Sequence, residues 1–148
     1  MPDRDTPTAD AWEPLRSELA ADLRRVADRL RSMSQTRLEA QVVPPEHGMP
    51  PWGSRAAAAR GVATLMSDVA SALEAAAAGG GYPGYRPLPE LSVHATGDQV
   101  AVAGHDLQAA LDLVGPDDPA WFGPYDRRPA RGGVQPAVRV LADVRRQL

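Results

Sequence analysis

An apolar stripe near the N-terminus constrains the fold more than any other feature of the sequence. Its residues recur in steps of four and three, which places them on one face of an α-helix. Two consecutive prolines, Pro44 and Pro45, must end this helix, because proline has no N–H for the helical ladder. The pattern predicts a long first helix over about 12–42. The stripe consists of Leu15, Leu19, Leu23, Val26, Leu30 and Met33.

A second stripe of the same kind follows a proline-rich break. Ser54 is a suitable N-cap for it, and the three glycines at 79–81 end it, which predicts a second helix over 54–78. Two helices of similar length with a short connection predict an antiparallel hairpin in which each helix covers the other's stripe. The second stripe consists of Val62, Leu65, Met66, Val69, Leu73 and Ala76.

The segment around Val100 allows two interpretations. Alternating apolar residues favour a β-hairpin over 91–104, whereas apolar residues in steps of three and four favour a core helix over 97–114, with a capping box formed by Thr96 and Gln99. The helical pattern has more matches, so we expect the helix and keep the hairpin as the alternative. A last helix is predicted over 134–148, with Pro136 at its first position.

Together these elements predict an all-α, four-helix bundle-like fold. We expect residues 11–148 to form a single helical domain after a flexible leader at 1–10. Its loops at 79–95 and 115–133 are rich in proline, glycine and aromatic residues. An alanine-rich core buries little apolar area per residue, so we expect a homodimer that uses the two long helices.

Composition excludes several kinds of site. The chain has no cysteine, and therefore no disulfide, thiolate metal ligand or cysteine nucleophile. Lysine is also absent, and an alanine- and arginine-rich composition is typical of a high-GC bacterial genome. We find no signal peptide and no run of about 18 apolar residues, which predicts a cytoplasmic protein without membrane contact.

Arginines and aromatic residues are the candidate partner-binding residues. A basic face from the first helix and the second loop would suit nucleic acid, but neighbouring acids three or four residues away and a net charge of −3 favour a self-paired surface. The aromatic residues of the second loop either plug the helices or contact a partner. The candidates are Arg24, Arg25, Arg29, Trp121, Phe122, Tyr125, Arg127 and Arg128.

No residue pattern predicts a catalytic, cofactor or metal site. His47 and His94 lie in expected loops without a second ligand three or four residues away, and His105 is expected on the exposed face of its helix with Asp98 and Asp112. We therefore expect a non-enzymatic interaction or regulatory protein that binds another protein. A nucleic-acid-binding regulator is the first alternative, and a small metal- or ligand-dependent enzyme is the second.

Overall fold

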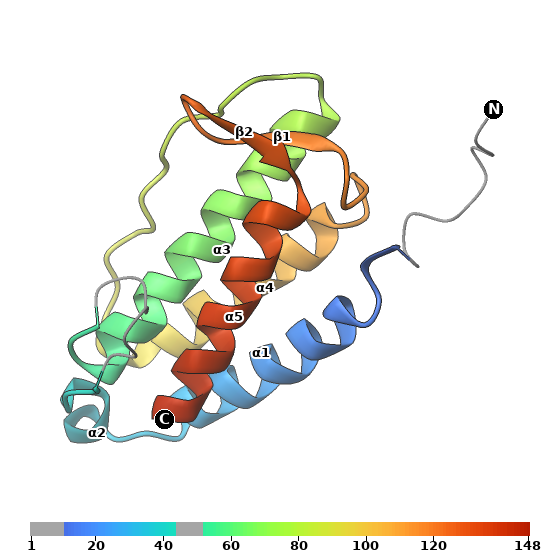
Figure 1. Cartoon of the computed structure of the whole chain (residues 1–148). Helices are drawn as coiled ribbons and strands as arrows, with labels where there is room; N and C mark the ends of the chain where they lie inside the picture. Colours follow the sequence, from blue (N-terminus) through green and yellow to red (C-terminus); the bar gives the residue numbers. More distant parts are fainter. Residues whose placement is uncertain (1–10, 44–51) are drawn as a thin grey trace.

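Four helices carry the core of the protein, which a computed structural model describes over residues 11–43 and 52–148 (Figure 1). The expectation of a mostly helical chain is confirmed, but the described residues also include a small antiparallel sheet. The expected leader at 1–10 lies outside the described residues. The elements are α1 (Leu15–Arg31), α2 (Gln35–Glu39), α3 (Arg55–Ala77), the 3-10 helix η2 (Val93–Ala95), α4 (Thr96–Ala110), β1 (Pro119–Gly123), β2 (Asp126–Pro129) and α5 (Arg131–Gln147).

The four long helices pack in the cyclic order α1, α4, α3, α5, so that α1 and α3 lie across the core from each other. The expected hairpin of the first two long helices is therefore wrong. One physical reason is the composition of α3, which buries alanines and larger residues around most of its circumference instead of along one stripe. A helix of this kind needs partners on several sides, and α4, α5 and β1 provide them.

Two glycines on α4 explain why α1 packs against it. A Cβ atom at Gly97 would lie 3.0 Å from the carbonyl oxygen of Ala27, and one at Gly104 would overlap the side chain of Leu23. Both glycines are buried, and both Ala27 and Leu23 belong to the buried face of α1. The two helices can approach closely only because these positions have no side chain.

The predicted first helix ends eleven residues early, since α1 stops at Arg31 and not near residue 42. Ser32 and Ser34 are the reason, because serine side chains compete for backbone hydrogen bonds at helix ends. Ser32 Oγ donates to the carbonyl of Arg29 (2.8 Å), and Ser34 caps the separate helix α2 by accepting from the N–H of Arg37 (3.4 Å). Pro44 and Pro45 lie outside the described residues.

The helical interpretation of the segment around Val100 is confirmed, and the β-hairpin over 91–104 is wrong. The helix is α4, which ends at Ala110 and not at 114. The capping box does not form. Thr96 Oγ1 donates to the carbonyl of Val93 (2.8 Å), and Gln99 Nε2 donates to the carbonyl of Pro89 (2.9 Å).

The predicted loop at 115–133 is wrong over most of its length. β1 and β2 form a hairpin within it, and α5 begins at Arg131, so that Pro136 lies inside the helix and not at its start. A proline inside a helix leaves the carbonyl four residues earlier without its usual donor. Here that carbonyl belongs to Gly132, and Arg128 Nη1 donates to it (2.8 Å).

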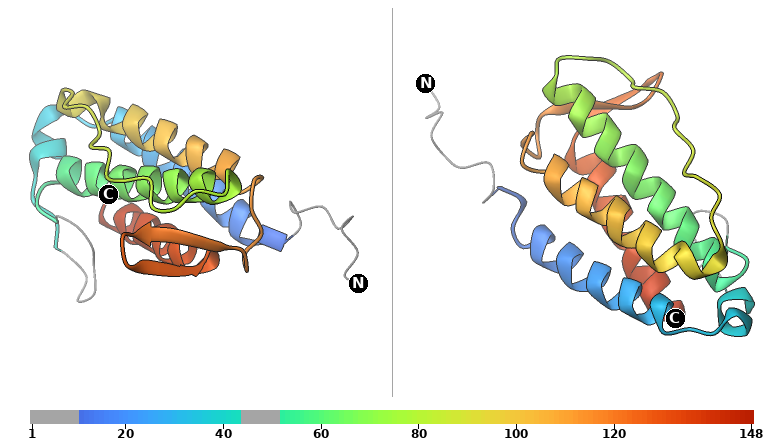
Figure 2. Two further views of the ribbon diagram at one scale, coloured as in Figure 1. Left: turned by 90° about the horizontal axis from the view of Figure 1, so that it is seen from above. Right: turned by 180° about the vertical axis from the view of Figure 1, so that it is seen from behind.

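The segment 78–92, which we name the strap, has no regular secondary structure, in agreement with the loop predicted there. Figures 1 and 2 show that it runs back along α3 from the end of that helix to the start of α4. Gly79 and Gly84 have φ values of 75° and 85°, a conformation that favours glycine. Arg60 Nη2 donates to the carbonyl of Leu88 (3.3 Å) and holds the strap against α3.

Candidate binding cavity between the hairpin and the strap

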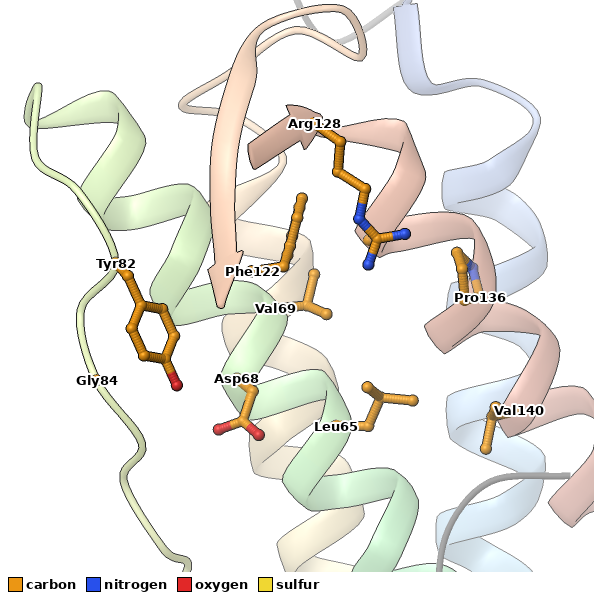
Figure 3. A pocket seen from close by; sticks show the side chains of 10 residues that line it. Leu65, Asp68, Val69, Tyr82, Gly84, Phe122, Arg128, Pro136 and Val140 are labelled. Carbon is orange, nitrogen blue, oxygen red and sulfur yellow. The ribbon is translucent and has the colours of Figure 1, made fainter. Parts of the chain in front are cut away.

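Four elements meet around a cavity of about 210 Å³ near the β-hairpin (Figure 3). Helices α3 and α5 form its floor, the hairpin covers one side, and the strap borders another. The cavity therefore depends on segments that are far apart in the sequence. Its lining residues are Leu65, Asp68, Val69, Tyr82, Gly84, Phe122, Arg128, Gly133, Pro136 and Val140.

Phe122 anchors the hairpin over the helices. The ring lies against Gly133 so closely that a Cβ atom at this glycine would overlap it. Leu65, Val69 and Val140 complete an apolar floor beneath the ring. The hairpin packs closely against α5 because Gly133, in the first turn of that helix, has no side chain.

Arg128 forms the polar side of the cavity near the hairpin. Its guanidinium group lies 5.2 Å from the centroid of the Phe122 ring, within the range of a cation–π interaction. One nitrogen, Nη1, donates to the carbonyl of Gly132, and the other, Nη2, forms an ion pair with Asp126 at 3.1 Å. The positive charge of Arg128 is thus already compensated by a neighbouring carboxylate.

Asp68 forms the acidic side of the cavity, on α3. Partial burial raises the pKa of this carboxyl group above its ordinary value, because desolvation disfavours the charged form. Within residues 11–43 and 52–148, no basic side chain forms an ion pair with Asp68. Of the two charged residues in the cavity wall, Asp68 is therefore the one without an ion-pair partner among the described residues.

The three tyrosines of the chain lie on the two segments beside this cavity. Tyr82 and Tyr85 belong to the strap and are 39% and 63% exposed, and Tyr125 at the hairpin tip is 97% exposed. The strap passes the hairpin tip in Figure 1 and in both views of Figure 2. We name Tyr82, Tyr85 and Tyr125 the tyrosine surface.

The residues predicted to bind a partner fall into two separate groups. Phe122 and Arg128 line the cavity, Trp121 and Arg127 face each other across the hairpin, and Tyr125 is at its tip. The arginines of α1 are elsewhere, and the three predicted there are Arg24, Arg25 and Arg29, all exposed.

The distance between these groups follows from the contacts of α5. Arg29 Nε donates to the carbonyl of Leu148 (3.4 Å) at the end of α5, whereas Arg128 binds Gly132 at its start. The 17 residues of α5 span about 25 Å. The arginines of α1 and of the hairpin therefore do not form one continuous basic face.

The ion pairs expected on the first helix form only in part. Asp28 pairs with Arg31 at 3.6 Å, as the spacing predicts. Asp22 is buried and pairs with Arg145 of α5 at 3.1 Å instead of with Arg25. Asp22 thus contributes to the contact between α1 and α5 and not to a self-paired surface of the first helix.

The histidines form no cluster in the described part of the chain. His94 and His105 are exposed, and His47 lies outside the described residues. Asp98 and Asp112, the acids expected beside His105, pair with Arg31 and Arg16 of α1. No group of three His, Asp or Glu residues in the ranges 11–43 and 52–148 could hold a metal ion.

Reasoning from the sequence missed Asp68 and Tyr82. Asp68 stands between Leu65 and Val69 of the second apolar stripe, and an acid next to a buried position is the signal that could have identified it. Tyr82 follows a glycine run and shows no periodic signal. Its role depends on where the strap passes.

Across the described ranges, the helices are too short or too polar to cross a membrane. Comparisons with protein-family models, with curated proteins and with solved structures found no match to this chain.

Proposed function

We propose that this protein binds another protein through the tyrosine surface and the adjoining cavity. The observation that carries the proposal is the exposure of all three tyrosines on two segments that meet beside one cavity. Arg127, also exposed on the hairpin, adds a cationic group at its rim. The cyclic packing of α1, α4, α3 and α5 supports describing the scaffold that presents this surface as a four-helix bundle.

The distribution of aromatic residues supports this choice of surface. Aromatic residues are only 5% of the chain, yet the single phenylalanine, all three tyrosines and Trp121 lie on the strap or the hairpin. Tyrosine is enriched at binding hot spots because it supplies a large amphipathic contact at a low cost in conformational entropy. A cavity beside such residues can receive an anchoring side chain of the partner.

Capture of a partner from the native lysate, after nuclease treatment, tests the proposal. We expect a Tyr85→Ser, Tyr125→Ser double variant to bind the partner several hundredfold more weakly than the wild type, since two hot-spot residues at about 2 kcal/mol each contribute roughly 4 kcal/mol. Val102→Ser is the matched control, because Val102 is an exposed apolar residue on α4 outside the cavity.

Equal capture by the wild type and the tyrosine variant would contradict the proposed surface. Recovery of nucleic acid alone from untreated lysate, with affinity falling steeply as salt increases, would favour a nucleic-acid-binding regulator instead. Light scattering on the same purified proteins measures self-association, which we expect as a homodimer.

A further inference from the structure

The two charged residues around the cavity differ in whether a neighbouring charge compensates them. Only Asp68 and Arg128 among the lining residues carry a full charge, and Arg128 is compensated by Asp126 at 3.1 Å. Asp68 has no such partner among the described residues. A partly desolvated carboxylate is stabilised when a cation comes within hydrogen-bond distance of it. The cavity therefore favours a positively charged ligand group.

Aromatic rings near Asp68 point to the same class of ligand. The faces of Tyr82 and Phe122 carry negative electrostatic potential, which attracts ammonium and guanidinium groups. Phe122 already has the guanidinium group of Arg128 5.2 Å from its centroid, which leaves the ring of Tyr82 to contact a ligand cation. Figure 3 shows Asp68 on α3 between Tyr82 of the strap and the apolar floor, with Arg128 entering from the hairpin. A cation bound at Asp68 would thus lie beside the ring of Tyr82.

The floor and the size of the cavity set the shape of the ligand group. Leu65, Val69 and Val140 offer apolar contacts but no charge, which suits an alkyl chain that ends in a cation. A cavity of roughly 150 Å³ can hold benzene. The volume of about 210 Å³ therefore accommodates a butylammonium group, which is of similar size.

We propose that this cavity binds the alkylammonium group of a lysine side chain supplied by the partner protein. The identity of the source rests on the proposed function, whereas the preference for an alkylammonium group rests on the cavity alone. The chain itself contains no lysine, so neither its own segments nor a second copy can supply the group.

The single phenylalanine provides a direct reporter for this proposal. Incorporation of 4-fluorophenylalanine labels Phe122 alone, so one ¹⁹F resonance follows the cavity during titration of the full chain. The probes are n-butylammonium and Nα-acetyl-lysine N-methylamide, with Nα-acetyl-norleucine N-methylamide as the uncharged analogue. We expect saturable shifts with both amines at millimolar concentration and none with the norleucine derivative.

Asp68→Asn removes the charge while keeping the shape of the side chain, and we expect it to weaken the binding of both amines at least tenfold. Asp106→Asn is the matched control, because Asp106 is an exposed acid of α4 that does not line this cavity. Circular dichroism checks that both variants keep the helical fold. Equal binding by wild type and Asp68→Asn would overturn the proposal, as would equal binding of the norleucine probe.

The remaining outcomes separate the two proposals. Binding of n-butylammonium without the lysine derivative would overturn the partner lysine as source and leave a free amine as the ligand. No shift with either amine would overturn the ammonium site, while the effect of the tyrosine variants on partner capture would still decide the proposed function. Asp68-dependent binding of both amines, without tyrosine-dependent capture, would support the ammonium site and contradict the proposed surface.

Discussion

Gly104 offers a sharp test of why α1 packs against α4. Replacing glycine with alanine inside a helix normally stabilises a protein by about 1 kcal/mol, because alanine loses less backbone entropy on folding. At Gly104, however, the new methyl group would overlap the buried side chain of Leu23 on α1. Overpacking of this kind costs about 1–3 kcal/mol. We therefore expect Gly104→Ala to destabilise the protein by a net value of about 1 kcal/mol, taking the middle of that range.

Gly104→Ala should stabilise the protein instead of destabilising it when Leu23 is replaced by a smaller residue. Leu23→Ala alone costs about 2–5 kcal/mol, since it leaves a space between the helices. In that background the methyl group at position 104 has room, and Gly104→Ala should then stabilise by about 1 kcal/mol. A double-mutant cycle from urea unfolding measures both values, and the single change should also lower Tm by about 2–4 °C.

The helical propensity at an exposed position of the same helix serves as the control. Asp106→Ala should be more stable than Asp106→Gly by about 1 kcal/mol, because nothing crowds this side chain. If Gly104→Ala stabilises the wild-type protein as much as alanine does at position 106, the close approach of α1 and α4 is not what requires glycine there. The explanation given for the helix order would then fail.

Three further predictions concern single groups. Burial raises the pKa of Asp68, so the charged carboxylate destabilises the fold and Asp68→Asn should stabilise the protein near neutral pH. The difference in stability between the variant and the wild type should vanish below about pH 3.8, where the carboxyl group is protonated in both states, and urea unfolding at neutral and at low pH measures it. Pro136→Ala returns an N–H donor to the Gly132 carbonyl, so Arg128→Ala should destabilise this variant by about 1 kcal/mol less than it destabilises the wild type. A double-mutant cycle measures this, and additive effects of the two substitutions would contradict the view that Arg128 replaces the missing donor. Trp12 is buried and its Nε1 donates to the carbonyl of Val114 (2.8 Å), so Trp12→Phe should lower the free energy of unfolding by about 1–3 kcal/mol. Thermal or urea unfolding measures this value, and an unchanged stability would show that the hydrogen bond does not contribute.

Local periodicity was sufficient to identify the four long helices, and Ser54 with the glycine run also located both ends of α3, whereas the end of α1 and the start of α5 were predicted wrongly. Most of the predicted stripe of α1 is buried, and the buried residues of the α3 stripe are part of a wider buried surface, so a pattern that repeats over several turns identified both helices without any distant contact. The end of α1 depended instead on two serines, whose hydroxyls bind backbone groups only once the chain has turned. The start of α5 depended on a proline that is tolerated inside the helix because Arg128, four residues before Gly132, donates to the carbonyl that the proline leaves without a donor.

Neighbouring helices are harder to predict from sequence because packing partners are set by small residues. Gly97 and Gly104 are seven residues apart, which places them on the same face of α4, and a side chain at either position would collide with α1. The prediction for this segment used its apolar residues and the expected capping box, and gave no weight to these glycines. The short connection between the first two helices gave no guide to their packing, since α4 comes between them.

The candidate site was predictable in its hairpin residues and not in its helix residue. Phe122 and Arg128 were singled out because aromatic and basic residues concentrate in their segment, and both line the cavity. Asp68 was not singled out, because acids on helices are usually solvated. Its partial burial results from the strap and hairpin that fold over α3, which no pattern within α3 can indicate.

The first turns of α5 lack two groups that other residues would supply, a side chain at position 133 and an N–H at position 136, and both absences shape the cavity. Gly133 lacks a side chain and admits the ring of Phe122, while Pro136 lacks an N–H and leaves the Gly132 carbonyl for Arg128. Both gaps are filled by residues of the hairpin, so the hairpin is held by the same turn of helix that forms the cavity wall. A change that closes either gap should loosen the hairpin and alter the cavity together. For this reason the ¹⁹F resonance of Phe122 should respond to Pro136→Ala even without a ligand, whereas Asp106→Asn should leave it unchanged.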